Sequence, residues 1–452
     1  MNPAATAVSE TPVPFHPAST ADYVPREPLR GLQSERLRQV VCRAYEHVPL
    51  VRQRMQKLGL SPAEVRGVDD IHRLPFTTAA DLRGAYPMGM LAAPVQQVLR
   101  LHPCGGAAGR PIVAPYTRRD LEVQAEAVVR CLASCGVRQG DTIQNLCGYE
   151  LLGDGLGLHH ASETLGASII PFAGGDAARQ IMLMKDLGVT VICSTPSYFL
   201  YLAERAEKMG VDLRELPLRA GIFLGEPWSE AMRRRIEETA GIRAYDVYGL
   251  AEGIAPAMGA ECCHHGGLHV FEDHFYPEIV DPATGSPLAE GQEGELVLTA
   301  LSREAMPLIR YRTRDLTALL VEPCPCGRTM RRMQRIERRS DEMFVLQGVQ
   351  VFPSQVEAAL LAVEGTLPHY QIVLTQEKGL DQVEVLVEVT PQVFSDRVGA
   401  LESLQARLAH EIEHTLGVSL PVRLVEPQTI QRGQGTAQRV VDKRGASLPP
   451  ES

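Results

Sequence analysis

The sequence predicts an α/β fold in which a large N-terminal domain with largely parallel, buried sheets precedes a small α+β domain. The chain has 452 residues, which is enough for roughly two or three domains of ~150 residues. Between residues 117 and 301, short apolar runs bounded by Gly or Pro alternate with helical stretches, as strands and crossover helices do. The last hundred residues change style and carry a half-exposed, alternating strand.

The first elements follow from composition and spacing. Residues 1–28, rich in Pro, Ala, Ser and Thr, predict a disordered arm. Thr117 and Asp120 predict a helix start, because a hydroxyl with an acid three residues later caps two free backbone N–H groups. A second helix is predicted over 229–238. Strands are predicted at 167–172, 189–193, 220–224 and 295–301.

A domain boundary is predicted between Arg339 and Asp341, which divides the chain into residues 29–339 and 340–452. In the second part, four valines from Val383 to Val389 alternate with Glu384, Leu386 and Glu388, a half-exposed strand. The other elements expected there are helices near 354–362 and 397–414 and strands at 370–374 and 422–425.

Charge and composition exclude several function classes. Lys plus Arg is 45 and Asp plus Glu is 55, a net charge of −10, which argues against nucleic-acid or anionic-membrane partners. The first twenty residues lack the basic and apolar segments of a signal peptide, and no apolar run reaches the ~18 residues of a membrane helix. We therefore expect a cytoplasmic protein, whose ten cysteines stay reduced.

Six segments together resemble the phenylacetate-CoA ligase branch of the adenylate-forming acyl-CoA ligases. They read LPFTT at 74–78, YDVYGLAE at 245–252, EDHF at 272–275, GELV at 294–297, PLIRYRTRD at 307–315 and VFPSQ at 351–355. The resemblance runs from about Leu37 to Arg444. It implies mixed sheets flanked by helices, a swivelling C-terminal lid, and an enzyme that makes an acyl-AMP from ATP and an aryl acid before CoA takes the acyl group.

The phosphate loop departs from the family. Relatives read approximately SSGTTGKP where this chain reads CGGAAGRP at 104–111. Gly106, Gly109 and Arg110 keep the glycines and the cation of a phosphate cradle. Every hydroxyl is absent, and since charge-assisted hydrogen bonds contribute ~1.5–3 kcal/mol each, triphosphate binding should be much weaker. The alternative is a tolerated loop variant.

The remaining nucleotide residues are partly retained. Glu252 and Asp315 match the positions that hold magnesium and the ribose hydroxyls in relatives. Leu224 replaces a glycine and is expected to fill part of the adenine pocket. Thr436 stands where relatives carry a catalytic lysine, and a neutral side chain cannot replace a cation in an electrostatic role. Lys443 is a weak alternative source of that charge.

The acyl site and the thiol side of the lid are identified from the same resemblance. Tyr149 is expected to stack on an aryl ring. Glu150 and Asp154 either receive an amino group on that ring or are surface acids. Gly348 begins a lid loop that still matches the family. Three further acyl-binding residues are implied: Gly225, Tyr248 and Gly249.

Cys104 replaces a loop serine and suggests a covalent route. A thiolate beside backbone N–H groups is a good nucleophile, and His102 or His159 is the candidate base. The alternatives are a small buried filler at Cys104, and an acyl shuttle through AMP bound at Asp315.

A metal site is predicted away from these residues. The CPCG segment at 324–327 places two thiolates in a tight loop, and Cys262 and His269 lie upstream at the spacing of zinc-bearing relatives. The three thiolates of Cys262, Cys324 and Cys326 with one imidazole would form a closed tetrahedral site, so we expect structural and not catalytic zinc. Adjacent alternatives are Cys263, His264 and His265.

The replacements all affect the ATP-dependent half-reaction. We therefore expect an acyltransferase that moves an aryl acyl group, such as anthraniloyl, from CoA to the phosphopantetheine thiol of an acyl carrier protein, as aurachin-type relatives do. Its substrate would be a CoA thioester from a partner ligase in secondary metabolism, ATP and magnesium are doubtful, and a homodimer is a family-level expectation. The alternatives are an ATP-dependent, AMP-forming aryl-CoA ligase and a non-catalytic acyl-CoA-binding paralogue.

Overall fold

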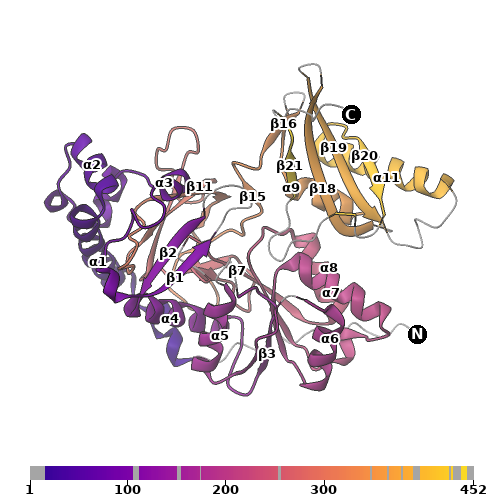
Figure 1. Cartoon of the computed structure of the whole chain (residues 1–452), viewed down its shortest axis with the longest axis horizontal. Helices are drawn as coiled ribbons and strands as arrows, with labels where there is room; N and C mark the ends of the chain where they lie inside the picture. The colour runs from indigo at the N-terminus through magenta and orange to yellow at the C-terminus, as the bar shows by residue number, and fades with distance from the viewer. Residues whose placement is uncertain are drawn as a thin grey trace.

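The computed structural model describes most of the chain, arranged as a large N-terminal part and a small C-terminal domain (Figure 1). The described residues are 16–104, 111–149, 154–173, 175–252, 256–346, 349–363, 366–377, 380–389, 398–426, 429–430 and 439–444. Among them, no helix is long and apolar enough to cross a membrane.

The chain is folded from residue 17, which corrects the disordered arm predicted to reach residue 28. The 3-10 helix η1 (Pro17–Tyr23) precedes α1 (Arg26–His47) and α2 (Pro49–Lys57). Asp22 is buried and accepts hydrogen bonds from Arg130 Nη2 at 2.6 Å and from Arg328 Nε at 3.1 Å. Those partners lie 108 and 306 residues away, so the local composition carries no sign of them.

The largest sheet has nine strands in the order β13-β14-β9-β8-β7-β6-β5-β3-β4. Its parallel half comprises β3 (Thr142–Asn145), β4 (Ser168–Ile170), β5 (Val191–Ser194), β6 (Ala220–Phe223) and β7 (Arg243–Tyr248). Two hydrophobic clusters share these strands, which places helices on both faces. They are α4 (Arg118–Ser134), α5 (Asp154–Leu165), α6 (Ala177–Asp186), α7 (Pro196–Lys208) and α8 (Glu230–Ala240).

The prediction of largely parallel sheets is right for this half and wrong for the rest. The other four strands of the same sheet pair antiparallel: β8 (Gly259–Ala260), β9 (Leu268–Val270), β13 (Leu319–Leu320) and β14 (Arg332–Met333). A second, antiparallel sheet contains β10 (Phe275–Val280), β11 (Gly294–Ala300), β12 (Tyr311–Thr317) and β15 (Arg338–Arg339). The apolar run at 295–301 is β11, buried along its whole length, because burial rather than strand direction produces such runs.

The two strands that flank the phosphate loop in sequence pair as a separate hairpin. It pairs β1 (Val98–Cys104) with β2 (Ile112–Thr117), and α4 follows directly. The predicted helix start is confirmed: Thr117 N–H donates to Asp120 at 2.9 Å and Asp120 N–H donates to the Thr117 hydroxyl at 3.1 Å. The short α3 (Ala79–Gly84) precedes the hairpin.

The C-terminal domain, hereafter the lid, has its own core. Its main sheet has the order β20-β19-β18-β21 and is packed by α9 (Pro353–Leu361) and α11 (Val398–Leu416). The strands are β16 (Phe344–Leu346), β17 (Val349–Val351), β18 (Thr366–Glu377), β19 (Leu380–Val389), β20 (Val422–Val425) and β21 (Val440–Asp442). The half-exposed strand predicted from alternating valines is β19.

Candidate active site

A cleft of about 980 Å³ lies between the N-terminal part and the lid. One wall is formed by the segments that follow β6 and β7, which run through Gly225 and Gly249, and the lid lines the other with α9, Tyr370 and Arg439. In Figure 1 the lid stands above β7 and α8. The carboxyl ends of parallel strands meet at one edge, where open α/β folds bind ligands. The cleft is therefore the expected location of the active site in this fold.

Asp315 anchors one end of the cleft. It lies on β12 and accepts hydrogen bonds from the Tyr248 hydroxyl at 2.5 Å and from Arg339 Nη1 at 2.6 Å. Burial raises the pKa of Asp315 although Arg339 opposes the shift, and burial next to Asp315 also raises the pKa of Tyr248. The two predicted residues Tyr248 and Asp315 are thus in direct contact, and Arg339, which sequence reasoning did not assign to the site, joins them.

The described lining of the cleft is strongly acidic. It carries eight carboxylates and two guanidiniums, and both guanidiniums are already paired. The acids are Glu226, Asp246, Glu252, Asp315, Glu337, Asp341, Glu342 and Glu357, and the arginines are Arg339 and Arg439. A polyanion entering such a cleft needs further cations, because like charges at this range repel.

Leu224 does not obstruct the cleft, which corrects the expectation that it fills an adenine pocket. Its side chain is buried in the main hydrophobic core, whereas the next three residues, 225–227, line the cleft. Gly225 has φ +88°, a conformation that favours glycine. Gly249 also lines the cleft, and a Cβ there would lie 2.2 Å from the Pro256 carbonyl oxygen, so a side chain is excluded.

The lid is held against α8 by a polar contact that sequence reasoning missed. The Ser229 hydroxyl donates to Glu357 at 3.0 Å, and Arg439 pairs with the same carboxylate at 3.3 Å. Arg439 also stacks over Tyr370, 4.4 Å from the ring centroid. Arg439 lies three residues after Thr436, so the segment that resembles the catalytic-lysine region was the available signal.

The predicted acyl residues are only partly described. Tyr149 receives a hydrogen bond from Asn145 Nδ2 at 3.1 Å and contacts His159 Nδ1 at 3.3 Å, and His159 lies 3.2 Å from Glu163. Asp154 begins α5, but its side chain lies outside the described residues, as does all of Glu150. The phosphate-loop residues Gly106, Gly109 and Arg110, and also Gly348 and Thr436, lie outside them too.

Cys104 has the surroundings of a packing residue. Its side chain is fully buried, belongs to the main core and donates to the Ile112 carbonyl at 3.5 Å. His102 lies two residues before Cys104 on β1, and both side chains are buried. His159 instead contacts Tyr149. Reactive thiols are partly exposed and electropositive, so this geometry disfavours the covalent route.

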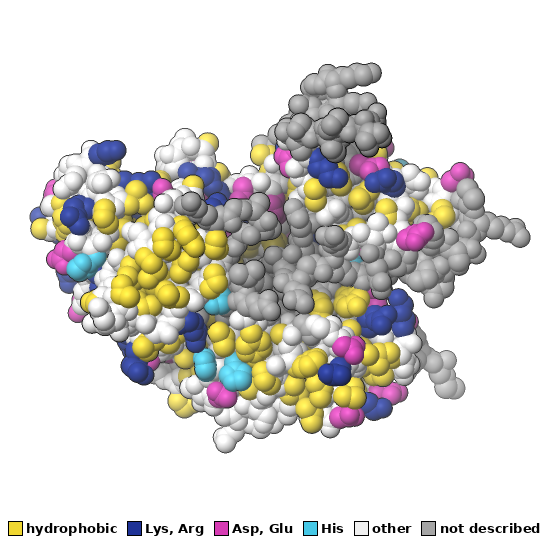
Figure 2. Space-filling model, viewed as in Figure 1, with side chains coloured by type: hydrophobic (Ala, Val, Ile, Leu, Met, Phe, Trp, Pro, Cys, Tyr) yellow, Lys and Arg dark blue, Asp and Glu magenta, His cyan; other side chains and the backbone are white. Residues whose placement is uncertain are grey.

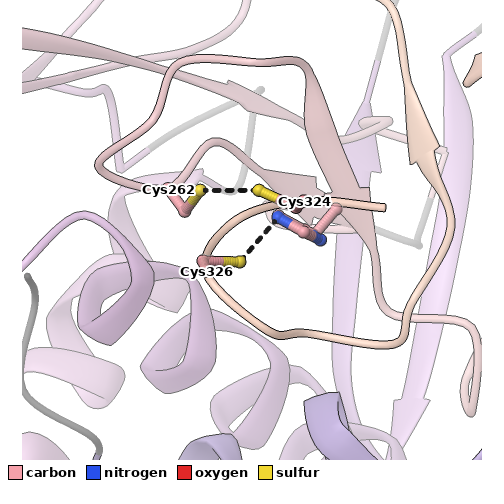
Figure 3. A group of neighbouring side chains, drawn as sticks. Cys262, Cys324 and Cys326 are labelled. Carbon is pink, nitrogen blue, oxygen red and sulfur yellow. Dashed lines mark hydrogen bonds between the residues drawn. The ribbon is translucent and has the colours of Figure 1, made fainter. Parts of the chain in front are cut away.

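Four predicted ligand residues come together beside β9. The donor atoms of Cys262, His269, Cys324 and Cys326 all lie within 4.8 Å of one another. Cys262 Sγ is 3.7 Å from Cys324 Sγ, and Cys326 Sγ is 3.4 Å from His269 Nε2 (Figure 3). Hydrogen bonds from Cys262 and His269 lower the pKa of Cys326 to about 2, so the cluster favours a thiolate.

These distances fit a tetrahedral metal ion. Zinc with Zn–S bonds of about 2.3 Å and a Zn–N bond of about 2.0 Å holds two sulfurs about 3.8 Å apart and a sulfur and a nitrogen about 3.5 Å apart. The set of four donors leaves no open position. Of the neighbouring alternatives, His265 stacks on Tyr245 at 5.0 Å and pairs with Glu261, so it faces elsewhere.

The fold defines the class of adenylate-forming enzymes: a large α/β domain and a small α+β C-terminal domain line a cleft of about 980 Å³ at the strand ends. Residues 160–301 match the family described as AMP-binding enzyme, and residues 348–444 match the AMP-binding enzyme C-terminal domain.

The chain belongs to the phenylacetate-CoA ligase family. It is 45% identical over 437 residues to a phenylacetate-coenzyme A ligase of Thermus thermophilus, covering 94% of this chain and 98% of that one. It is 42% identical to the Escherichia coli enzyme of the same name, covering 92% and 95%. The structure also resembles 2-hydroxyisobutyryl-CoA ligase in its postadenylation state, with a TM-score of 0.88 and 29% identity over 97% and 95% of the chains.

Proposed function

We propose that this protein is an acyltransferase built on an aryl-CoA ligase, which exchanges an aryl acyl group between CoA and the phosphopantetheine thiol of a carrier protein without ATP. The observation that carries the proposal is a contrast within one cleft. Asp315, Tyr248 and Arg339 are joined by hydrogen bonds at one end of the cleft, while the catalytic lysine and the loop hydroxyls expected to handle a triphosphate are replaced.

The end that contains Asp315 supports binding of a nucleoside monophosphate. Because Leu224 lies in the core, the segment after β6 leaves the cleft open, and its volume of about 980 Å³ is ample for AMP. Asp315 lines the cleft and matches the position that binds the ribose hydroxyls in relatives. A monophosphate brings less negative charge into the acidic lining than a triphosphate does.

The replacements at the catalytic-lysine position and in the phosphate loop argue against efficient adenylation. A lysine that stabilises charge on a reacting phosphate is an electrostatic group, and loss of one such group typically costs about 100- to 1,000-fold in rate. Thr436 occupies that position, and the CGGAAGRP loop offers no hydroxyl.

Thioester exchange needs neither of these groups. A nucleoside monophosphate held at Asp315 would supply a phosphate oxygen as the acceptor for the acyl group. In the net reaction the C–S bond to CoA breaks, a C–S bond to the carrier thiol forms, and the carrier's thiol proton ends on CoA. Two thioesters are exchanged, so no net source of energy is required. The buried position of Cys104 favours this route over a covalent enzyme intermediate.

We further propose that Cys262, His269, Cys324 and Cys326 bind structural zinc. The donor set and spacings support this ion, and the metal would tie the segment after β8 to the loop before β14.

A second candidate is an ordinary ATP-dependent aryl-CoA ligase. The observation that favours it is the 45% identity to a phenylacetate-coenzyme A ligase across nearly the whole chain. On this alternative, Arg110 and a water or Lys443 compensate for the replaced groups.

Mass spectrometry of a holo acyl carrier protein separates the candidates. The protein is incubated with the carrier and phenylacetyl-CoA or anthraniloyl-CoA, with no nucleotide, with AMP or with ATP. Loading that requires AMP and no ATP supports the transferase. Formation of aryl-CoA from the free acid with ATP, without carrier loading, supports the ligase and contradicts the first proposal.

A further inference from the structure

We propose that Ser229 and Glu357 form a latch that holds the lid in the orientation seen here and so sets the balance between a docked and an undocked lid. Ser229 lies at the N-terminus of α8 in the N-terminal part, and Glu357 lies on α9 of the lid. Both side chains are buried. The latch concerns the position of the lid and not the reaction, so it applies equally to a transferase and to a ligase.

A relative has been solved in several states that differ in how well they match this chain. 2-Hydroxyisobutyryl-CoA ligase gives a TM-score of 0.88 in its postadenylation state, 0.70 in its thioesterification state and 0.66 in an open conformation. The first two comparisons cover the same 97% of this chain and 95% of that one, so the two scores differ in how the parts are arranged. The lid above α8 in Figure 1 therefore has the postadenylation arrangement.

The Ser229 hydroxyl makes two hydrogen bonds of different kinds. It caps α8 by accepting from the Met232 N–H at 3.2 Å, and it donates its proton to Glu357 at 3.0 Å. The Ser229 N–H also donates to this carboxylate, at 3.4 Å. A hydroxyl can donate and accept at the same time, so one side chain serves both the helix and the lid. The lid thus places an anion at the positive end of α8.

The charge of Glu357 is balanced inside the lid. Arg439 lies 3.3 Å from Glu357 and stacks over Tyr370, and all three residues belong to the lid. When the lid leaves α8, Glu357 therefore keeps its cation and loses the bonds to Ser229. Loss of a neutral donor costs much less than loss of the cation beside a buried carboxylate. The contact thus has the strength that a reversible latch needs.

Other contacts between the lid and the N-terminal part include an apolar and a charged one. Leu361 packs against the hydrophobic cluster that contains side chains of α7 and α8, and His369 Nε2 lies 3.7 Å from Glu204 Oε1. On the face shown in Figure 2, the lid forms a lobe whose described side chains include acidic, basic and apolar groups, without one dominant sign of charge. A single like charge at Ser229 should therefore be enough to shift the balance.

Two substitutions of nearly equal size separate the latch from the helix cap. Ser229→Asn and Ser229→Asp both retain an oxygen that can cap α8. The asparagine amide can still donate to Glu357, whereas the aspartate carboxylate has no proton to donate and repels it. We expect Ser229→Asp to release the lid and Ser229→Asn to keep it docked, with the same melting temperature for the N-terminal part in both variants.

Single-molecule energy transfer on the full-length protein measures the docked and undocked populations. Dyes are attached through non-natural residues at the exposed positions Lys185 on α6 and Glu402 on α11, which leaves all ten cysteines untouched. We expect the ratio of undocked to docked lid to rise about 10- to 100-fold in Ser229→Asp, the range for loss of one hydrogen bond to a charged group. The ratio should stay within about threefold of the wild type in Ser229→Asn.

Two further variants test whether charge is the cause and guard against misfolding. Ser229→Asp combined with Glu357→Gln removes the repulsion and lets the new carboxylate accept a hydrogen bond from the lid, so the ratio should fall back about 10-fold or more. If Ser229→Asp does not fold, Ser229→Ala removes the hydroxyl without adding volume and should raise the ratio about fivefold or more.

Three results would overturn the latch. An unchanged ratio in Ser229→Asp would show that the contact does not hold the lid. Equal release by Ser229→Asn and Ser229→Asp would assign the effect to added volume, and absence of recovery in the double variant would show that Ser229 does not act through Glu357. None of these measurements requires acyl transfer, so the latch and the proposed function stand or fall separately.

Discussion

The cysteine–histidine cluster and the cleft under the lid are both built from residues distant in sequence, yet they are organised in opposite ways. In the cluster, all four donor atoms point toward one another and lie within 4.8 Å, so the site is complete in itself. In the cleft, eight carboxylates line an open space of about 980 Å³ with two arginines. A closed donor set fits our proposal of structural zinc and an open cleft fits our proposal of a ligand site, so mutations in the two regions should separate stability from chemistry.

The largest effect is expected from the cluster. Cys324→Ser should reduce zinc content from about one ion per chain to none and lower the free energy of unfolding by about 3 kcal/mol or more, because binding of a structural zinc ion adds directly to folding free energy. Atomic absorption and chemical denaturation measure the two quantities. Cys263→Ser is the matched control, since Cys263 is adjacent to Cys262 but outside the cluster. Equal loss in both variants would contradict the assignment.

A substitution in the cleft should change the affinity for AMP and leave the zinc content unchanged. Asp315→Asn removes a charge that Arg339 and Tyr248 hold in place, and we expect AMP affinity to fall about 10- to 100-fold, equivalent to ~1.5–3 kcal/mol of charged hydrogen bonding. Zinc content should not change. Calorimetric titration with AMP measures the loss, and Asp212→Asn, in an exposed ion pair with Arg214, is the control. Unaltered AMP affinity would place the nucleotide elsewhere.

A smaller effect, in the direction of gain, is expected at the other end of the cleft. Thr436→Lys restores a cation where ligases carry one and should raise ATP-dependent formation of aryl-CoA from the free acid about 10-fold or more, with Thr436→Ala showing no gain. Coupled detection of pyrophosphate measures the rate. A wild-type protein that already adenylates at the rate of the lysine variant would support the ligase alternative.

The smallest effect is expected at Cys104. Because its thiol is fully buried and donates to the Ile112 carbonyl, Cys104→Ala should leave the transfer rate within about twofold of the wild type, although the protein loses some packing. Transfer kinetics with a holo carrier measure the rate. Abolished transfer in a variant that remains folded would restore the covalent route.

Local sequence patterns correctly predicted the features that depend on residues close together in the chain, such as helix caps and strand bounds. Thr117 and Asp120 form the predicted cap, and β20 has the bounds expected for it. The four residues of the cluster were found because their spacing resembles that of zinc-bearing relatives. The family assignment, too, followed from motifs that the comparisons bear out.

Long-range contacts account for what the sequence could not predict. Asp22 folds the segment that composition marks as an arm, because it meets Arg130 and Arg328 far along the chain. Leu224 turns into the core instead of the cleft, since adjacent residues at a strand end face opposite sides. Glu357 and Arg439 join the cleft only when the lid is packed on α8, a contact with no local signature.

Isotope exchange between CoA and an aryl-CoA tests the central claim most directly, because it needs no carrier protein. The enzyme is incubated with phenylacetyl-CoA or anthraniloyl-CoA and isotopically labelled CoA, in the absence of ATP, with and without AMP, and the label in aryl-CoA is followed by mass spectrometry. We expect label incorporation that depends on AMP and is lost in Asp315→Asn. Absence of exchange with AMP, together with aryl-CoA synthesis from the free acid and ATP, would contradict it.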